Sequence, residues 1–111
     1  MKTAVIGSRN FGDYEMLKKA LGERDITQII SGGAKGADTL AKRYAKENDI
    51  PLLEFLPEYN KYGRSAPLKR NVLIIDASEV VIAFWDGQST GTAHSITQAR
   101  RVGKEVIIIS I

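Results

Sequence analysis

Cysteine is absent from this sequence, which excludes disulfide bonds, thiolate metal sites and cysteine nucleophiles together. The single histidine, His94, excludes a metal site built from several histidines. No apolar run is long enough to span a membrane, and no basic segment followed by a long apolar run opens the chain. We therefore expect a cytoplasmic protein with no metal and no membrane partner, and no motif indicates a resident cofactor.

The sequence also has little excess of one charge over the other. The formal net charge is +3, and both signs are spread along the chain. Such a surface does not by itself indicate nucleic-acid binding. The length of 111 residues suits one hydrophobic core, so we expect residues 1–111 to form a single domain.

Short apolar segments alternate with helical patterns along the chain. The pattern predicts strands at 3–6, 26–30, 51–56, 79–85 and 105–111, and helices at about 14–22, 37–48, 68–76 and 93–102. Asp13 is the expected N-cap of the first helix, and 57–66 is predicted to be a loop because it has no periodicity. This alternation predicts a three-layer α/β domain with a five-stranded, mainly parallel sheet.

The stretch 31–38 (SGGAKGAD) joins the second predicted strand to a helix through Gly32, Gly33 and Gly36. Backbone N–H groups at a helix start are unpaired and, with the positive end of the helix dipole, favour an anion such as phosphate. The alternative is a tight strand-to-helix turn with no ligand, and the motif alone does not decide between the two.

Polar and glycine residues follow three of the predicted strands. Ligands of open parallel sheets bind beyond the carboxyl ends of the strands, near the point where the strand order reverses. The candidates from these positions are Gly7, Ser8, Arg9, Gly32, Gly33, Gly36, Asp86, Ser89, Gly91 and Thr92. The alternative for Arg9 is a salt bridge at the rim of the sheet, and for Asp86 a cap on the following helix.

Four ordered motifs resemble the SLOG superfamily, specifically its small YspA-type (YpsA-related) branch. They are Gly7-Ser8-Arg9 with Asp13, the run from Gly32 to Asp38, Tyr62-Gly63 leading to Arg70-Asn71, and Ala83 to Gly87 with Gly91-Thr92. The resemblance covers nearly the whole chain. It implies a Rossmann-like fold, with the expected strand order 3-2-1-4-5, that binds nucleotides or nucleotide-derived ligands. It adds Asp38, Arg70, Asn71 and Gly87 to the candidate ligand-binding residues.

Relatives in this superfamily include cytokinin-activating phosphoribohydrolases, molybdenum-cofactor carrier proteins and the DNA-processing protein DprA. The phosphoribohydrolases use a Pro-Gly-Gly-x-Gly-Thr-x-x-Glu motif and an upstream arginine for catalysis. Arg70 matches that arginine, whereas the glutamate falls on Ser95, which cannot stabilise an oxocarbenium-like centre as a carboxylate does. Asp86 is another source of a carboxylate, so Asp86 and Arg70 are the catalytic candidates, and the sequence leaves open whether a reaction occurs.

The leading expectation is a binding protein, such as a sensor, for a nucleotide or nucleotide-derived phosphorylated ligand. One alternative is a nucleotide or N-glycosidic hydrolase. Another is a nucleic-acid-binding accessory protein that uses Tyr59, Lys61, Tyr62 and Arg64, which ranks last because a charge of +3 is weak. The helix at 67–76 is more apolar than one buried face requires, which predicts a homodimer through it.

Overall fold

Strands and helices alternate through the computed structural model, which describes all residues, 1–111. The elements are β1 (Lys2–Gly7), α1 (Tyr14–Gly22), β2 (Gln28–Ser31), α2 (Ala37–Glu47), β3 (Leu52–Glu54), α3 (Tyr59–Tyr62), a 3₁₀ turn at Gly63–Ser65, α4 (Ala66–Ala77), β4 (Val80–Trp85), α5 (Thr90–Arg101) and β5 (Glu105–Ser110). The longest helices have 12 residues, and none combines the length and apolarity needed to cross a bilayer.

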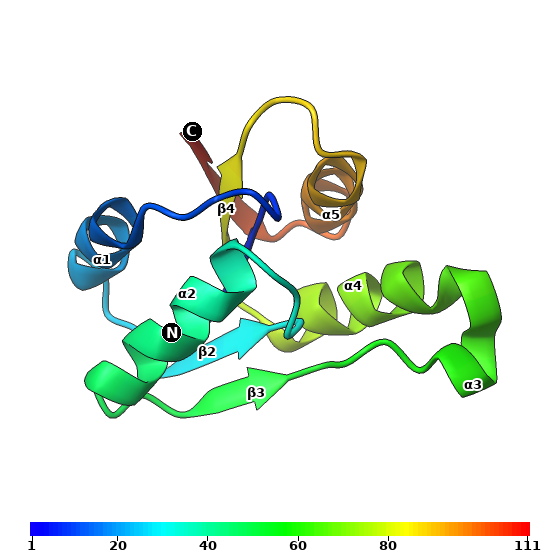
Figure 1. Cartoon of the computed structure of the whole chain (residues 1–111), viewed down its shortest axis with the longest axis horizontal. Helices are drawn as coiled ribbons and strands as arrows, with labels where there is room; N and C mark the ends of the chain where they lie inside the picture. The colour runs from blue at the N-terminus through cyan, green and yellow to red at the C-terminus, as the bar shows by residue number, and fades with distance from the viewer.

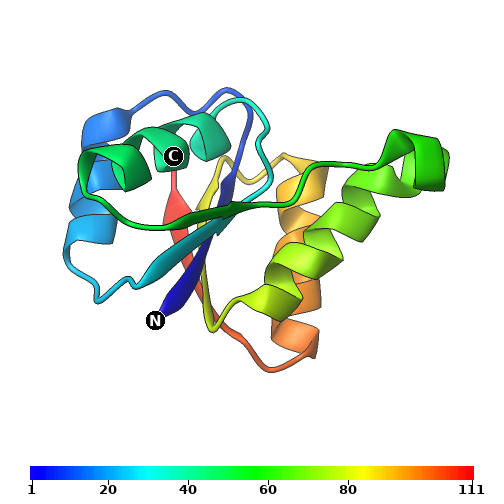
Figure 2. The same cartoon turned by 90° about the horizontal axis from the view of Figure 1, so that it is seen from below.

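The five strands form one parallel sheet in the order β3-β2-β1-β4-β5. The helices α1 and α2 cover one face and α4 and α5 cover the other, as Figures 1 and 2 show. The predicted Rossmann-like α/β architecture and its strand order are therefore confirmed. The chain runs outward from β1 to β3 and returns to β4 on the other side of β1, so the strand order reverses between β1 and β4.

Each face of the sheet carries its own apolar cluster. In β1, Val5 packs with α1 and α2, whereas Ala4 and Ile6 pack with α4 and α5. Phe11, in the loop after β1, stacks on Phe84 of β4 with ring centroids 4.8 Å apart. Because both faces of the central strands are buried, these strands have apolar side chains on both sides and lack polar alternation.

The prediction of a loop at 57–66 was wrong. Residues Tyr59–Tyr62 form the short helix α3, and the 3₁₀ turn Gly63–Ser65 leads from it directly into α4. A helix of four residues makes about one turn, so it has no repeating apolar face for a sequence pattern to detect. This segment lies at the far end of α4 and projects away from the sheet (Figure 2).

A cluster of three side chains joins α1 to α2. The Tyr14 hydroxyl donates to Glu47 Oε1 at 2.7 Å, and Arg43 Nε donates to Glu47 Oε2 at 3.0 Å. The Arg43 guanidinium lies 3.8 Å from the centroid of the Tyr14 ring. Burial, reinforced by the Glu47 carboxylate, raises the pKa of Tyr14 to about 12. The phenol therefore stays protonated and keeps donating throughout the neutral range.

We expect Tyr14→Phe to lower the free energy of unfolding by about 1 kcal/mol at neutral pH, because one hydrogen bond is lost. The folded pKa of about 12 lies above the ordinary 10.0, so the stabilisation is complete below pH 10 and is lost as the pH rises through 12. Urea denaturation at several pH values checks this. Between those pH values the wild type should lose stability more steeply than Tyr14→Phe, and equal slopes would contradict the assignment.

Candidate functional site

A polar cleft of about 570 Å³ opens where β1 and β4 end. It is lined by the loop after β1, by the starts of α2 and α5, and by one side of α4. Most of the predicted ligand-binding residues line it, namely Gly7, Ser8, Arg9, Asp38, Arg70, Asn71, Asp86, Ser89, Gly91 and Thr92. The cleft thus lies at the reversal point of the strand order, where open parallel sheets bind their ligands.

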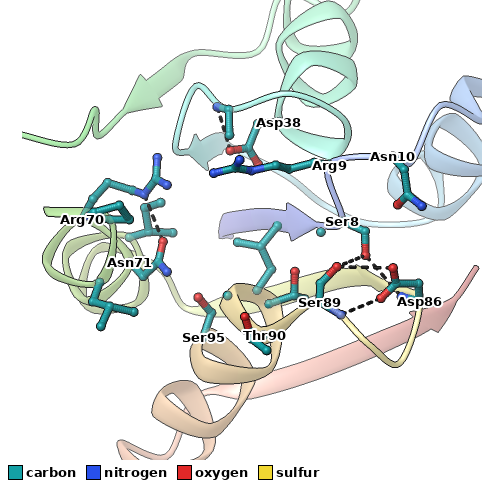
Figure 3. Close-up of a pocket in the computed structure, with 18 residues that line it drawn as sticks. Ser8, Arg9, Asn10, Asp38, Arg70, Asn71, Asp86, Ser89, Thr90 and Ser95 are labelled. Carbon is teal, nitrogen blue, oxygen red and sulfur yellow. Dashed lines mark hydrogen bonds between the residues drawn. The ribbon is translucent and has the colours of Figure 1, made fainter. Parts of the chain in front are cut away.

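The loop before α5 is held in place by hydrogen bonds to Ser8, the residue after β1, and by hydrogen bonds within itself. Ser89 Oγ lies 2.9 Å from the buried Ser8 Oγ, which also accepts from the Asp86 amide at 3.3 Å (Figure 3). Asp86 Oδ1 accepts from the amides of Gln88 and Ser89, both at 2.8 Å. These two amides hold the pKa of Asp86 below its usual value. Asp86 is therefore an ionised carboxylate that orders the loop ahead of α5.

The first amides of α5 have no partner inside the helix. The first intrahelical bond from this turn runs from the Ala93 amide to the Ser89 carbonyl at 3.1 Å. The amides of Thr90, Gly91 and Thr92 precede it, and these three residues line the cleft. The start of α5 consequently has the unpaired donors and the dipole that favour an anion.

The glycines of the 31–38 loop pack against the chain itself. Gly36 precedes α2 with φ of +79°, and a Cβ there would overlap the carbonyl oxygens of Ser8 and Arg9. A Cβ at Gly32 would overlap the Arg70 guanidinium. Neither glycine lines the cleft, nor do Gly33 and Gly87, so ligand contact by these four remains a prediction. Gly36 instead allows the start of α2 to pack closely against the loop after β1.

Asp38 and Arg70 both hydrogen-bond to the glycine loop. Asp38 Oδ2 accepts from the Ala34 amide at 3.0 Å. Arg70 of α4 donates from Nη1 to the Gly32 carbonyl at 2.5 Å and from Nε to Asn71 Oδ1 at 3.0 Å. Burial raises the pKa of Asp38, although the Ala34 amide and the charge of Arg70 oppose this. The carboxylate therefore occupies the Ala34 amide, which is not available to an anion.

Arg9 makes no ion pair and no side-chain hydrogen bond. The two ion pairs of the structure are Lys42–Glu54 and Arg43–Glu47, so the rim salt bridge considered for Arg9 does not form. Its exposed side chain extends from the end of β1 toward the cleft, as Figure 3 shows. Arg9 is thus a cation of the cleft that no other residue neutralises by direct contact.

Several residues that line the cleft were not predicted from the sequence to contact a ligand. They are Ile6, Asn10, Ala34, Pro67, Leu68, Ile74, Thr90 and Ser95. Ser95 follows Thr92 by three residues on α5, so helical spacing places both on one face and could have indicated it. Pro67, Leu68 and Ile74 come from α4 and give the cleft an apolar side, which only the packing of α4 beside α5 reveals.

The fold and the cleft define a Rossmann-like α/β domain with a polar site at its strand-order reversal. The YspA, cpYpsA-related SLOG family (YAcAr) matches residues 1–62. Gene 61 protein of Mycobacterium phage D29 is 33% identical over 117 aligned residues, which cover 96% of this chain and 94% of that protein. The chain therefore belongs to the YspA, cpYpsA-related SLOG family, and the resemblance drawn from its motifs is confirmed.

Solved structures of low sequence identity share the fold. DNA processing protein A (DprA) of Streptococcus pneumoniae matches with a TM-score of 0.83 and 24% identity, over 99% of this chain and 50% of that one. DprA of Helicobacter pylori, described for its single-stranded DNA binding mode, has a TM-score of 0.74 and 24% identity, and the match covers 97% of this chain and 64% of that one. TM1055 has a TM-score of 0.69 and 22% identity, and the match covers 96% of this chain and 72% of that one. The chain thus spans half of the pneumococcal protein, and these matches establish the fold alone.

Proposed function

We propose that this domain binds a nucleotide or a nucleotide-derived phosphorylated ligand in the cleft between α2, α4 and α5. The observation that carries the proposal is that the unpaired amides of α5 line the same cleft as two arginines, Arg9 and Arg70. The cleft volume of about 570 Å³ lies within the usual range for small-molecule sites. Family membership supports the same class of ligand.

The charges of the cleft indicate where the phosphate of a ligand would bind. The phosphate takes the amides of Thr90, Gly91 and Thr92 at the start of α5, where the helix dipole is positive. Arg9 adds a planar cation that can bind phosphate oxygens in a bidentate way. Arg70 is fixed by its bonds to Gly32 and Asn71, so it contributes charge at a constant position.

A thermal-unfolding panel of nucleoside mono-, di- and triphosphates, ribose phosphates and NAD derivatives tests this proposal. A ligand at one hundred times its dissociation constant stabilises the fold by about 2.7 kcal/mol, which gives a clear rise in Tm. Native mass spectrometry of the purified protein can identify a ligand that copurifies. A folded protein whose Tm moves with no member of the panel would contradict the proposal.

Hydrolysis of a nucleotide or an N-glycosidic bond is a second candidate. In its favour, Arg70 and Ser95 both line the cleft. These two positions align with the catalytic arginine and glutamate of the phosphoribohydrolases. Asp86 would then supply the carboxylate. Turnover of nucleoside monophosphates that is lost in Asp86→Asn and retained in Ser95→Ala would support it, and no turnover by the wild type would exclude it.

Binding of single-stranded nucleic acid is a third candidate, favoured by the projecting segment at 59–65. Tyr59 is exposed there, and the ammonium groups of Lys61 and Lys69 lie 5.2 Å and 5.9 Å from the centroid of the Tyr62 ring. Aromatic rings beside cations are the elements that bind bases and phosphates of single strands. This candidate requires salt-dependent binding that weakens when Lys61 and Arg64 are both changed to glutamine.

A homodimer through α4 is part of the proposal. Leu68 and Leu73 of this helix are 46% and 49% exposed, and covering them would remove apolar surface from water. Sedimentation should give a dimer that Leu73→Glu dissociates. A monomer at high protein concentration would contradict it. The cytoplasmic location stays a prediction from the sequence.

A further inference from the structure

One part of the cleft holds no charged group. The four charged residues that line the cleft are Arg9, Asp38, Arg70 and Asp86. Arg70 is bound to the Gly32 carbonyl, and Figure 3 shows its guanidinium on the side of Arg9 and Asp38. Asp86 is held by the amides of its own loop. What remains between α4 and the first turns of α5 is lined by uncharged side chains.

Two polar groups border this uncharged space without a partner in the protein. Ser95 of α5 is only 4% exposed, and no hydrogen bond joins its hydroxyl to another residue of the cleft (Figure 3). Asn71 of α4 accepts from Arg70 Nε at Oδ1, which fixes its amide and leaves Nδ2 free to donate. Buried hydroxyls are normally hydrogen-bonded, so Ser95 indicates a ligand group that supplies the missing partner.

The remaining walls of this space are apolar. Ile6 at the end of β1 and Ile74 of α4 belong to the buried cluster beneath α4 and α5 and also line the cleft, as do Pro67 and Leu68 of α4. A group with apolar faces and a hydrogen-bonding edge suits both kinds of wall, and a nucleobase is such a group. A sugar would bury hydroxyls against aliphatic side chains that cannot pair with them.

We propose that the space between α4 and α5 binds the base of the nucleotide, with Asn71 Nδ2 and Ser95 Oγ hydrogen-bonding to the edge of the ring. This inference rests on the proposed function, since it assigns one part of the same ligand. It goes beyond it by naming an uncharged heteroaromatic ring as the selected group and two side chains that recognise it. It does not depend on which amides of the cleft hold the phosphate.

Ribose 5-phosphate and the nucleotides AMP, GMP, CMP and UMP are the probes that test this, because they share a sugar phosphate and differ in the base. Calorimetric titration of the wild type should show at least one nucleotide binding about tenfold or more tightly than ribose 5-phosphate. Ser95→Ala should reduce this preference by about three- to tenfold, because one hydrogen bond to the base is lost. The affinity for ribose 5-phosphate should change by less than about twofold.

Two further variants define the effect. Ser95→Leu fills the space and should abolish the preference for a nucleotide while ribose 5-phosphate still binds. Thr97→Ala removes a hydroxyl from an exposed position of α5 outside the cleft and should change neither affinity. The Tm of each unliganded variant shows that it is folded, and Ser95→Ala, which removes no hydrogen bond to another residue of the cleft, should keep the wild-type value.

The possible failures of this test are distinguishable. If the wild type binds ribose 5-phosphate as tightly as all four nucleotides, the base subsite is overturned while the proposed function stands. The same holds if the folded Ser95 variants keep the wild-type preference, because the base then lies elsewhere. If the wild type binds neither ribose 5-phosphate nor any nucleotide of the panel, the proposed function fails together with this inference.

Discussion

Replacing Gly36 with alanine is expected to lower the free energy of unfolding by about 2–4 kcal/mol. A φ of +79° is strained for a residue with a side chain, and the added Cβ would lie 2.6 Å from the Arg9 carbonyl oxygen and closer still to that of Ser8. Both neighbours are backbone atoms in the loop after the central strand β1, so they cannot move aside without displacing the cleft.

Gly63→Ala is the matched control for this substitution. Gly63 has a backbone close to that of Gly36, with φ of +58° and ψ of −132° against +79° and −124°, but no atom lies within 4 Å of the position that a Cβ would take. It therefore isolates the backbone cost, about 1–3 kcal/mol. Urea denaturation of both variants gives the difference in free energy that belongs to the overlap. Equal losses would show that α2 is not packed closely on the loop after β1.

Arg9→Ala is expected to weaken binding of a nucleoside monophosphate by about 10- to 100-fold, the usual effect of losing a charged hydrogen-bond donor. The unliganded protein should keep its Tm, because Arg9 is exposed and makes no contact that stabilises the fold. Isothermal titration and thermal unfolding measure the two quantities separately. Most cleft residues do not permit this separation, since Arg70 and Asp86 both hold loops in place.

Two further variants show whether the effect of Arg9 is local. Arg24→Ala removes an equal charge from an exposed position outside the cleft and should leave the affinity within about twofold at physiological salt. Arg9→Lys keeps the charge and loses the planar pair of donors, so an intermediate affinity is expected. If Arg9→Ala and Arg24→Ala weaken binding equally, general attraction and not the cleft is responsible.

Much of the fold could be predicted because it depends on patterns within each segment. The apolar run before Gly7 and the one before Trp85 identify strands buried on both faces, and Asp13 does accept from the Met16 amide at the start of α1. The segment 57–66 could not be predicted, because a single helical turn has no period and its shape depends on α4.

The position of the cleft could be predicted from the sequence, but the contacts within it could not be assigned. The carboxyl ends of the strands correctly indicated Ser8, Ser89 and Thr92 as neighbours. A glycine can contact a ligand or another part of the protein backbone, and which of the two it contacts depends on how the folded chain is arranged around it. The loop after β1 makes that contact at Gly36. For the same reason, the bond between Asp38 and the Ala34 amide follows from the folded turn and not from the residue types.

The binding site itself is tested most directly by titrating ¹⁵N-labelled protein with a nucleoside monophosphate and following every backbone amide by NMR. We predict saturable shift changes that centre on the amides of Gly91 and Thr92 at the start of α5, with Arg9 and Asp38 also affected and the 59–65 segment unchanged. Saturable changes confined to the 59–65 segment, or none at α5, would contradict it.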